Sequence, residues 1–300
     1  MLRGVTTIRS SVVRLADGRQ LDVLTGGAED GPALVTHHGT PGEAHRYAGW
    51  ADAVGTRGMR FVAYSRPGYA GSTRSPGRSV ADATADVAEL LDQLGVDRFV
   101  SLGGSGGGPH SIACAALLAE RCLAATALVT VAPWGAEGLD WMREMAQINI
   151  DEFGAALEGE AALRAWMASE GEVFRHVTGA EIRSALGEAL PPVDQAVMTA
   201  TYAERSADHM RRALRDGFDG WVDDDLAFTR PWGFELGSIS VPVTIWQGEL
   251  DRLVPWSHGE WLAARIPGAE FRLAEGHGHF SLGETNREEI LDWLLAASSA

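Results

Sequence analysis

Lysine is absent from this 300-residue sequence, so all 25 of its basic residues are arginines. A Walker A phosphate loop needs a lysine to reach the nucleotide phosphates, and pyridoxal phosphate enzymes form a Schiff base on a lysine. The sequence therefore excludes a P-loop nucleotidase and a lysine-dependent pyridoxal phosphate enzyme.

Positive charge is scarce as well. Acidic residues outnumber basic ones 41 to 25, which gives a formal net charge of -16. A surface of that sign repels phosphate groups, so we expect neither nucleic acid nor an anionic membrane as a partner. A small-molecule substrate is the expected partner, and the oligomeric state is left open.

Long apolar runs and cysteines are few. No run approaches the roughly 18 apolar residues of a membrane span, and the first 20 residues lack the apolar stretch of a secretory signal. We therefore expect a cytoplasmic protein. The two cysteines, Cys114 and Cys122, are predicted to lie in one helix, about 12 Å apart, which is too far for a disulfide.

Strands and helices alternate in the first part of the chain. Apolar runs bounded by glycine and aspartate predict strands near 10–16, 20–26, 33–38, 59–64, 98–103 and 125–131. Residues 80–94 have helical spacing that ends at Gly95. This alternation predicts an α/β fold with a mostly parallel sheet and helices on both faces.

The alternation stops at about residue 134 and returns after 231. Between these points the patterns are helical, and large apolar residues such as Trp141, Phe153 and Met198 are frequent. We expect a core formed by 1–133 and 232–300, and a helical insertion at 134–231. Part of the insertion should form an apolar pocket. The acidic run 223–225 is expected to be a solvated loop, although carboxylates there could bind a substrate ammonium.

Residues 103–107 read Gly-Gly-Ser-Gly-Gly and match G-x-S-x-G, a turn that joins a strand to a helix and exposes a serine hydroxyl. The segment lies directly after a predicted strand and before a predicted helix, as this turn requires. A dinucleotide-binding loop is the alternative, but no G-x-G-x-x-G register fits. Ser105 is therefore the candidate nucleophile.

A serine hydroxyl needs a histidine to take its proton, and the histidine needs a carboxylate to orient it. The loop after the strand at 242–248 offers Glu249 and Asp251, and we favour Asp251. The segment before the last helix offers His277 and His279, and we favour His279.

Metal-ligand patterns are missing. No H-E-x-x-H or H-x-H-x-D-H spacing supports a site built from the histidines at 37, 38, 277 and 279. We expect no metal and no cofactor. The other histidines are expected to be surface or structural residues: His45, His110, His176, His209 and His258.

Three segments together resemble the α/β-hydrolase family: His-Gly-Thr-Pro-Gly at 38–42, the turn at 103–107, and the pair Asp251 and His279. Residues 66–72 are similar to the family's R-x-G-[FY]-G-x-S loop, with Ser65 where aspartate is common and Ala70 where glycine is usual. The resemblance implies a mostly parallel eight-stranded sheet flanked by helices, a Ser-Asp-His triad, and a helical cap after the sixth strand. The insertion lies at that point.

Attack on a carbonyl places negative charge on its oxygen, which two backbone N–H groups can stabilise. Gly106 supplies the first donor, because it follows the nucleophile at a helix N-terminus. The resemblance implies that the second donor is Thr40, the residue after His-Gly. These two residues are the expected oxyanion hole.

The expected function is therefore a serine hydrolase that cleaves a carboxylic ester of a small to medium apolar substrate through an acyl-enzyme on Ser105. A proline iminopeptidase-like aminopeptidase is the first alternative, because residues 38–42 are similar to His-Gly-Gly-Pro-Gly. Those relatives usually have tryptophan where this chain has Gly106. Acyl transfer, carbon-carbon bond hydrolysis and a binding protein with low turnover are further alternatives.

Overall fold

The computed structural model describes residues 7–187 and 190–298, which form an eight-stranded sheet of order β1-β2-β4-β3-β5-β6-β7-β8. β2 is antiparallel to both of its neighbours, and the remaining pairs are parallel. The mostly parallel eight-stranded sheet expected from the sequence is confirmed. The strands are β1 (Arg9–Arg14), β2 (Gln20–Gly27), β3 (Ala33–His37), β4 (Arg60–Tyr64), β5 (Phe99–Gly104), β6 (Cys122–Leu128), β7 (Val243–Gly248) and β8 (Glu270–Ala274).

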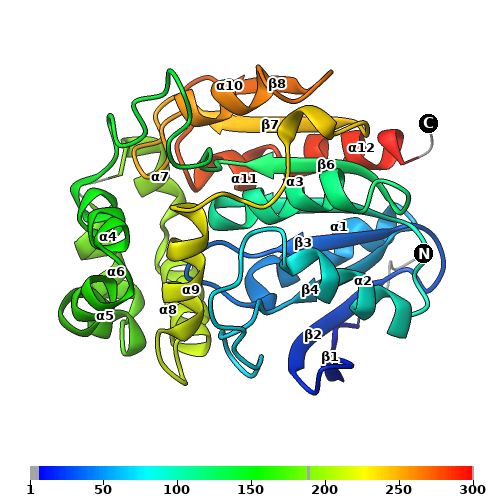
Figure 1. The fold of residues 1–300 in the computed structure, drawn as a ribbon, viewed down its shortest axis with the longest axis horizontal. Helices are drawn as coiled ribbons and strands as arrows, with labels where there is room; N and C mark the ends of the chain where they lie inside the picture. The colour runs from blue at the N-terminus through cyan, green and yellow to red at the C-terminus, as the bar shows by residue number, and fades with distance from the viewer. Residues whose placement is uncertain (1–6, 188–189, 299–300) are drawn as a thin grey trace.

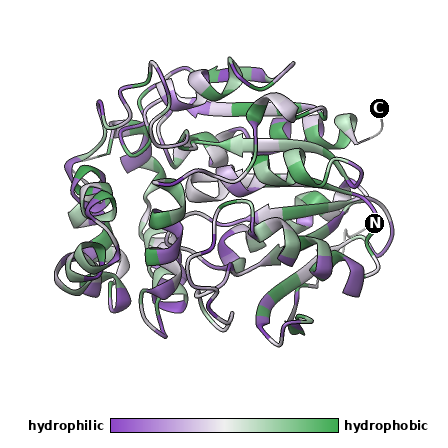
Figure 2. Cartoon of the chain, in the orientation of Figure 1, coloured by the Kyte–Doolittle hydropathy of each residue, from purple (hydrophilic) through white to green (hydrophobic). Residues whose placement is uncertain are grey.

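Helices cover both faces of the sheet (Figure 1). One face packs against α1 (Ala51–Thr56), α11 (Ser281–Thr285) and α12 (Arg287–Ala297). The other packs against α2 (Ala83–Gln93), α3 (Gly108–Leu117) and α10 (Ser257–Ala263). Figure 2 shows hydrophobic residues along the central strands, with hydrophilic colour concentrated on outer helices and loops. Burial of this apolar surface is the main force that holds the layers together.

The sixth strand lies three residues earlier than the predicted 125–131. β6 is Cys122–Leu128, and the chain then leaves the sheet at Val129, whose φ is +45°. Residues 129–131 are Val-Thr-Val and are buried without being a strand, so their strand-like composition misled the prediction. Cys114 lies in α3 and Cys122 in β6, and the prediction that both lie in one helix was wrong. A turn at Leu118–Arg121 ends the helix before Cys122.

Between β6 and β7 the described chain contributes no strand to the sheet, and residues 147–228 are mostly helical. Figure 1 shows these helices grouped at one end of the molecule, with both termini at the other end. They are α4 (Gln147–Glu158), α5 (Glu160–Trp166), a π-helix (Met167–Gly171), a 3-10 helix (Glu172–Arg175), α6 (Gly179–Gly187), α7 (Pro192–Val197), α8 (Ala200–Ala213) and α9 (Asp219–Phe228). Within the described ranges, no helix has the length and apolar content needed to cross a membrane.

Candidate active site

Ser105 occupies a tight turn between β5 and the helical residues that lead into α3. Its φ is +54°, in the left-handed region that non-glycine residues rarely adopt. The neighbouring glycines are required by close backbone packing. A Cβ on Gly103 would collide with the carbonyl oxygen of Gly107, and a Cβ on Gly107 would collide with that of His37. The turn thus holds the serine in a strained conformation at the carboxyl end of the sheet.

His279 and Asp251 are brought together from the loops after β8 and β7. His279 Nδ1 lies 2.8 Å from Asp251 Oδ2. Asp251 Oδ1 accepts hydrogen bonds from the N–H groups of Leu253 (2.8 Å) and Val254 (2.9 Å), which fix the carboxylate. Burial of His279 opposes protonation, but the charge and hydrogen bond of Asp251 outweigh it and raise the histidine pKa above its ordinary value.

The alternative pair lies elsewhere. Glu249 Oε2 accepts a hydrogen bond from the N–H of Gly276, and the carboxylate bonded to the His279 ring among the described residues is that of Asp251. His277 is not among the residues that line the cavity described below, whereas His279 is. The geometry therefore places His279 and Asp251, and not His277 and Glu249, at the site.

Asp194 of α7 is a site residue that the sequence analysis missed. It is fully buried, and its carboxylate accepts hydrogen bonds from the backbone N–H groups of His279 (2.7 Å), Phe280 (3.2 Å) and Ser281 (2.8 Å). It thus holds the loop that carries His279. No sequence pattern marked Asp194, because its partners are 85 to 87 residues away along the chain.

Thr40 and Gly106 lie against each other near Ser105. A Cβ on Gly106 would collide with Thr40 Oγ1, and a Cβ on Gly39 would lie 3.4 Å from the Cβ of Ser105. The Thr40–Pro41 peptide bond is cis. Thr40 N–H has no hydrogen-bond acceptor in the part of the chain that the structure describes. Gly106 is at the start of a helix, where N–H groups have no partner within the helix.

The acidic run 223–225 is not a solvated loop, and that expectation was wrong. All three residues belong to α9 and are buried. Asp223 pairs with Arg74 through two contacts of 2.8 Å, and Asp224 pairs with Arg66 at 2.6 Å. Buried carboxylates of this kind need such partners.

A cavity of about 310 Å³ opens beside Ser105, and Thr40, Gly106 and His279 also line it. Several side chains on its wall come from the helices between β6 and β7, and most are apolar. The apolar ones are Ile148, Phe153, Val173, Phe174, Val177, Ile182, Ala185, Met198, Met210, Trp221 and Phe228.

Two buried acids on that wall lack a cationic partner. Both carboxylate oxygens of Asp225 are buried and meet no hydrogen-bond donor from the described residues. Glu152 accepts a hydrogen bond from Trp221 Nε1 (2.6 Å), and its carboxyl interacts with that of Asp225. Burial raises the pKa of both carboxyls, and their proximity to each other raises that of Asp225 further. Each of the two carboxyls therefore favours its protonated form more than an exposed carboxyl does.

Other histidines are held by structural contacts. His37 contacts Tyr64 OH and Ser101 Oγ, both at 3.1 Å, and burial lowers its pKa to about 3. His110 Nδ1 bonds to the carbonyl oxygen of Gly106 at 3.0 Å, and burial holds its pKa well below the usual value. His209 differs because it lines the cavity, with Nδ1 2.7 Å from Glu43 Oε1.

A family model described as "alpha/beta hydrolase fold" matches residues 32–285. The chain is 32% identical over 120 residues to epoxide hydrolase A of Mycobacterium tuberculosis. This match covers 38% of this chain and only 37% of that enzyme. It is 26% identical over 297 residues to a 2-hydroxy-6-oxononadienedioate/2-hydroxy-6-oxononatrienedioate hydrolase of Klebsiella pneumoniae, which covers 93% of both proteins.

Among solved structures, epoxide hydrolase A from Mycobacterium thermoresistibile matches with a TM-score of 0.71 and 19% identity, over 97% of this chain and 98% of that one. At this identity the likeness shows a shared fold.

Proposed function

This chain belongs to the α/β-hydrolase family and is a hydrolase, and on that premise we propose that it cleaves carboxylic esters through an acyl-enzyme on Ser105. The observation that carries the proposal is the grouping of Ser105, His279 and Thr40 around one cavity, with His279 bonded to Asp251. Fold alone would not select this chemistry.

In the proposed reaction, Ser105 Oγ attacks the ester carbonyl while His279 Nε2 takes the hydroxyl proton. Asp251 holds the imidazole through Nδ1 and stabilises its protonated form. The N–H groups of Thr40 and Gly106 stabilise the oxyanion, and His279 returns the proton to the leaving alcohol. A water molecule then cleaves the acyl-enzyme by the same steps. In the present geometry no hydrogen bond joins Ser105 to His279 among the described residues, and such contacts often tighten when substrate binds.

The cavity wall supports an apolar substrate of small to medium size. We propose that residues 134–231 act as a lid whose apolar side chains hold the acyl or alcohol group. Four acidic residues line the cavity, Glu152, Glu181, Asp225 and Glu284, against one arginine, Arg46. This charge balance disfavours a dicarboxylate such as the one in the name of the Klebsiella relative.

The test is labelling with an organophosphonate, followed by peptide mapping and by Ser105→Ala kinetics on short aryl esters. We expect the label on Ser105 and a kcat lowered at least about a thousandfold in the variant. Ser238→Ala, a change at an exposed serine, is the control. Labelling elsewhere, or a variant with a tenth of the parental activity, would contradict the proposal.

The buried acids Glu152 and Asp225 favour a second candidate, an aminopeptidase or an esterase for substrates that carry an amino group. An ammonium ion could bind beside the two carboxyls and supply the donor that Asp225 lacks among the described residues.

Paired substrates separate the two candidates: an aryl ester with a terminal amino group and its isostere with a methyl group, together with aminoacyl arylamides. A higher kcat/KM for the amino ester than for its methyl isostere would select the second candidate, provided that Asp225→Asn abolishes this preference. Higher kcat/KM for the methyl isostere, with no turnover of the arylamides, would select the apolar ester.

A further inference from the structure

Asp224 of α9 contacts loops of the sheet core that lie far apart in the sequence. Its Oδ2 accepts hydrogen bonds from Thr40 Oγ1 (2.7 Å) and Tyr69 OH (2.8 Å) and lies 2.6 Å from Arg66 Nη2. Its Oδ1 lies 2.7 Å from Arg78 Nη2. The carboxylate and both guanidinium groups are shielded from water, so each charge depends on the others.

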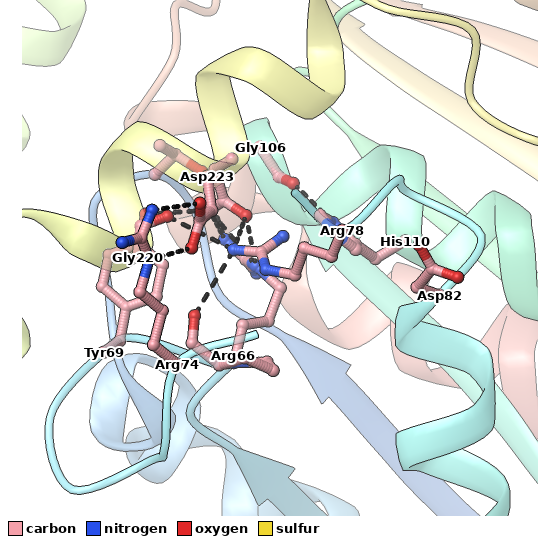
Figure 3. A network of polar contacts seen from close by, with 12 residues as sticks. Arg66, Tyr69, Arg74, Arg78, Asp82, Gly106, His110, Gly220 and Asp223 are labelled. Atoms are coloured by element: carbon pink, nitrogen blue, oxygen red, sulfur yellow. Dashed lines mark hydrogen bonds and ion pairs between the residues drawn. The ribbon is translucent and has the colours of Figure 1, made fainter. Parts of the chain in front are cut away.

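Figure 3 shows Arg66, Tyr69 and Arg74 reaching from their loop toward Gly220 and Asp223 of α9. Arg66, which is paired with Asp224, also contacts the loop that follows β3. Its guanidinium donates hydrogen bonds to the carbonyl oxygen of His38, to that of Gly39 (3.0 Å) and to Thr40 Oγ1 (3.1 Å). Arg66 therefore contacts two successive carbonyl groups of this loop, and the Gly39 carbonyl oxygen also lies 2.7 Å from His38 Nδ1.

The position of the Gly39 carbonyl determines where the N–H of Thr40 points. In a trans peptide the C=O and N–H lie on opposite sides, so a carbonyl held against Arg66 directs the Thr40 N–H away from Arg66. This N–H has no acceptor within residues 7–187 and 190–298, as an oxyanion donor requires.

We propose that Asp224 is a positioning residue for hydrolysis, which sets the N–H of Thr40 through Arg66 and through the Thr40 hydroxyl. The inference rests on the proposed function. It makes α9 part of the framework of the active site. If α9 moved away, Arg66 and Arg78 would remain as buried positive charges without a counter-charge, and the loop after β3 would lose its support.

Asp223 offers a matched control for Asp224. It is the preceding residue of α9, it is buried, and it pairs with Arg74 through two contacts of 2.8 Å. Both aspartates anchor α9 to the core, but only Asp224 contacts the loop at 38–40. If a substitution lowered activity only by weakening the docking of α9, the Asp223 and Asp224 variants would both lose activity.

The experiment compares Asp224→Asn with Asp223→Asn on a short aryl ester. We expect kcat to fall about 10- to 100-fold in Asp224→Asn with KM within about twofold, because one oxyanion donor is typically worth 100- to 1000-fold in kcat. Asp223→Asn should change kcat by less than about threefold.

An arylboronic acid, which forms a tetrahedral adduct on the serine, provides a second readout. Its inhibition constant should rise as kcat falls in Asp224→Asn. Equal effects of the two aspartate variants, or an effect on KM alone, would overturn the inference. A parent that neither cleaves esters nor is labelled at Ser105 would overturn the proposed function itself.

If Asp224→Asn does not fold, as judged by circular dichroism, Thr40→Val decides. This variant keeps the N–H and all buried charges but removes the hydroxyl that bonds to Asp224. We expect kcat to fall about tenfold and Thr40→Ser, which keeps a hydroxyl, to recover most of the loss. Parental kcat in Thr40→Val would overturn the inference.

Discussion

His279 differs from the other buried histidines in the direction of its pKa shift. Burial lowers the pKa of His37, His38, His110 and His258, which keeps them neutral in the core. Burial opposes the charge on His279 too, but Asp251 is close enough to reverse the net effect. A histidine whose protonated form is stabilised by a neighbouring carboxylate is the kind that acid-base catalysis needs.

The pH dependence of activity follows from this shift. The proposed base must be neutral to accept the proton of Ser105, so kcat/KM should rise with pH through a midpoint above 6.5, the ordinary value for histidine. His279→Ala should lower kcat at least about a thousandfold, whereas His277→Ala should retain most activity because His277 does not line the cavity. The measurement is kcat/KM between pH 5 and 9. An inactive His277→Ala with an active His279→Ala would reverse the assignment.

At the scale of elements, the sequence predicted the strands and turns that depend on the local residue pattern. The strands that lead to Ser105 and to Asp251 lie close to where they were expected, because each is an apolar run that ends at a glycine. The end of β6 was misplaced because residues 129–131 are buried for tertiary reasons. Asp194 and Asp224 were not identified, since their roles depend on contacts between segments that are distant in the sequence.

Asp194 of helix α7 holds the backbone of the loop that carries His279, so we expect Asp194→Asn to affect both stability and activity. The amide nitrogen would face a backbone N–H where the carboxylate oxygen now accepts, which should destabilise the fold by about 1–3 kcal/mol. Loss of the negative charge should also lower the pKa of His279, so the midpoint of the pH profile should move to lower pH.

Urea unfolding and the pH profile of the Asp194→Asn variant measure the two effects. Asp151→Asn, at an exposed position of α4, is the control and should alter neither. An unchanged midpoint would show that Asp194 does not act on His279.

At the scale of the molecule, the cavity lies between the sheet core and the helices of the insertion. If this wall selects the substrate, each added methylene of an acyl chain should raise kcat/KM about fourfold until the cavity is full, from about 0.8 kcal/mol per buried CH₂. Ile148→Phe, on α4 at the cavity wall, should lower kcat/KM for long chains and leave the acetyl ester within about twofold.

The comparison is a series of aryl esters from acetyl to octanoyl. Leu157→Phe is the matched control, because this leucine lies on the same helix but is 40% exposed and does not line the cavity. The same response in both variants, or a flat series in the parent, would show that the insertion does not set chain length.

Two carboxylates of the insertion, Asp194 and Asp224, contact the core. These contacts limit how freely the insertion could be exchanged between relatives. A chimera that carries a foreign insertion would lose Asp194 and Asp224 together, and with them the support of the His279 loop and the counter-charge of Arg66 and Arg78. Grafting should therefore succeed only when the donor insertion brings acids to both positions, or when the two arginines are replaced at the same time.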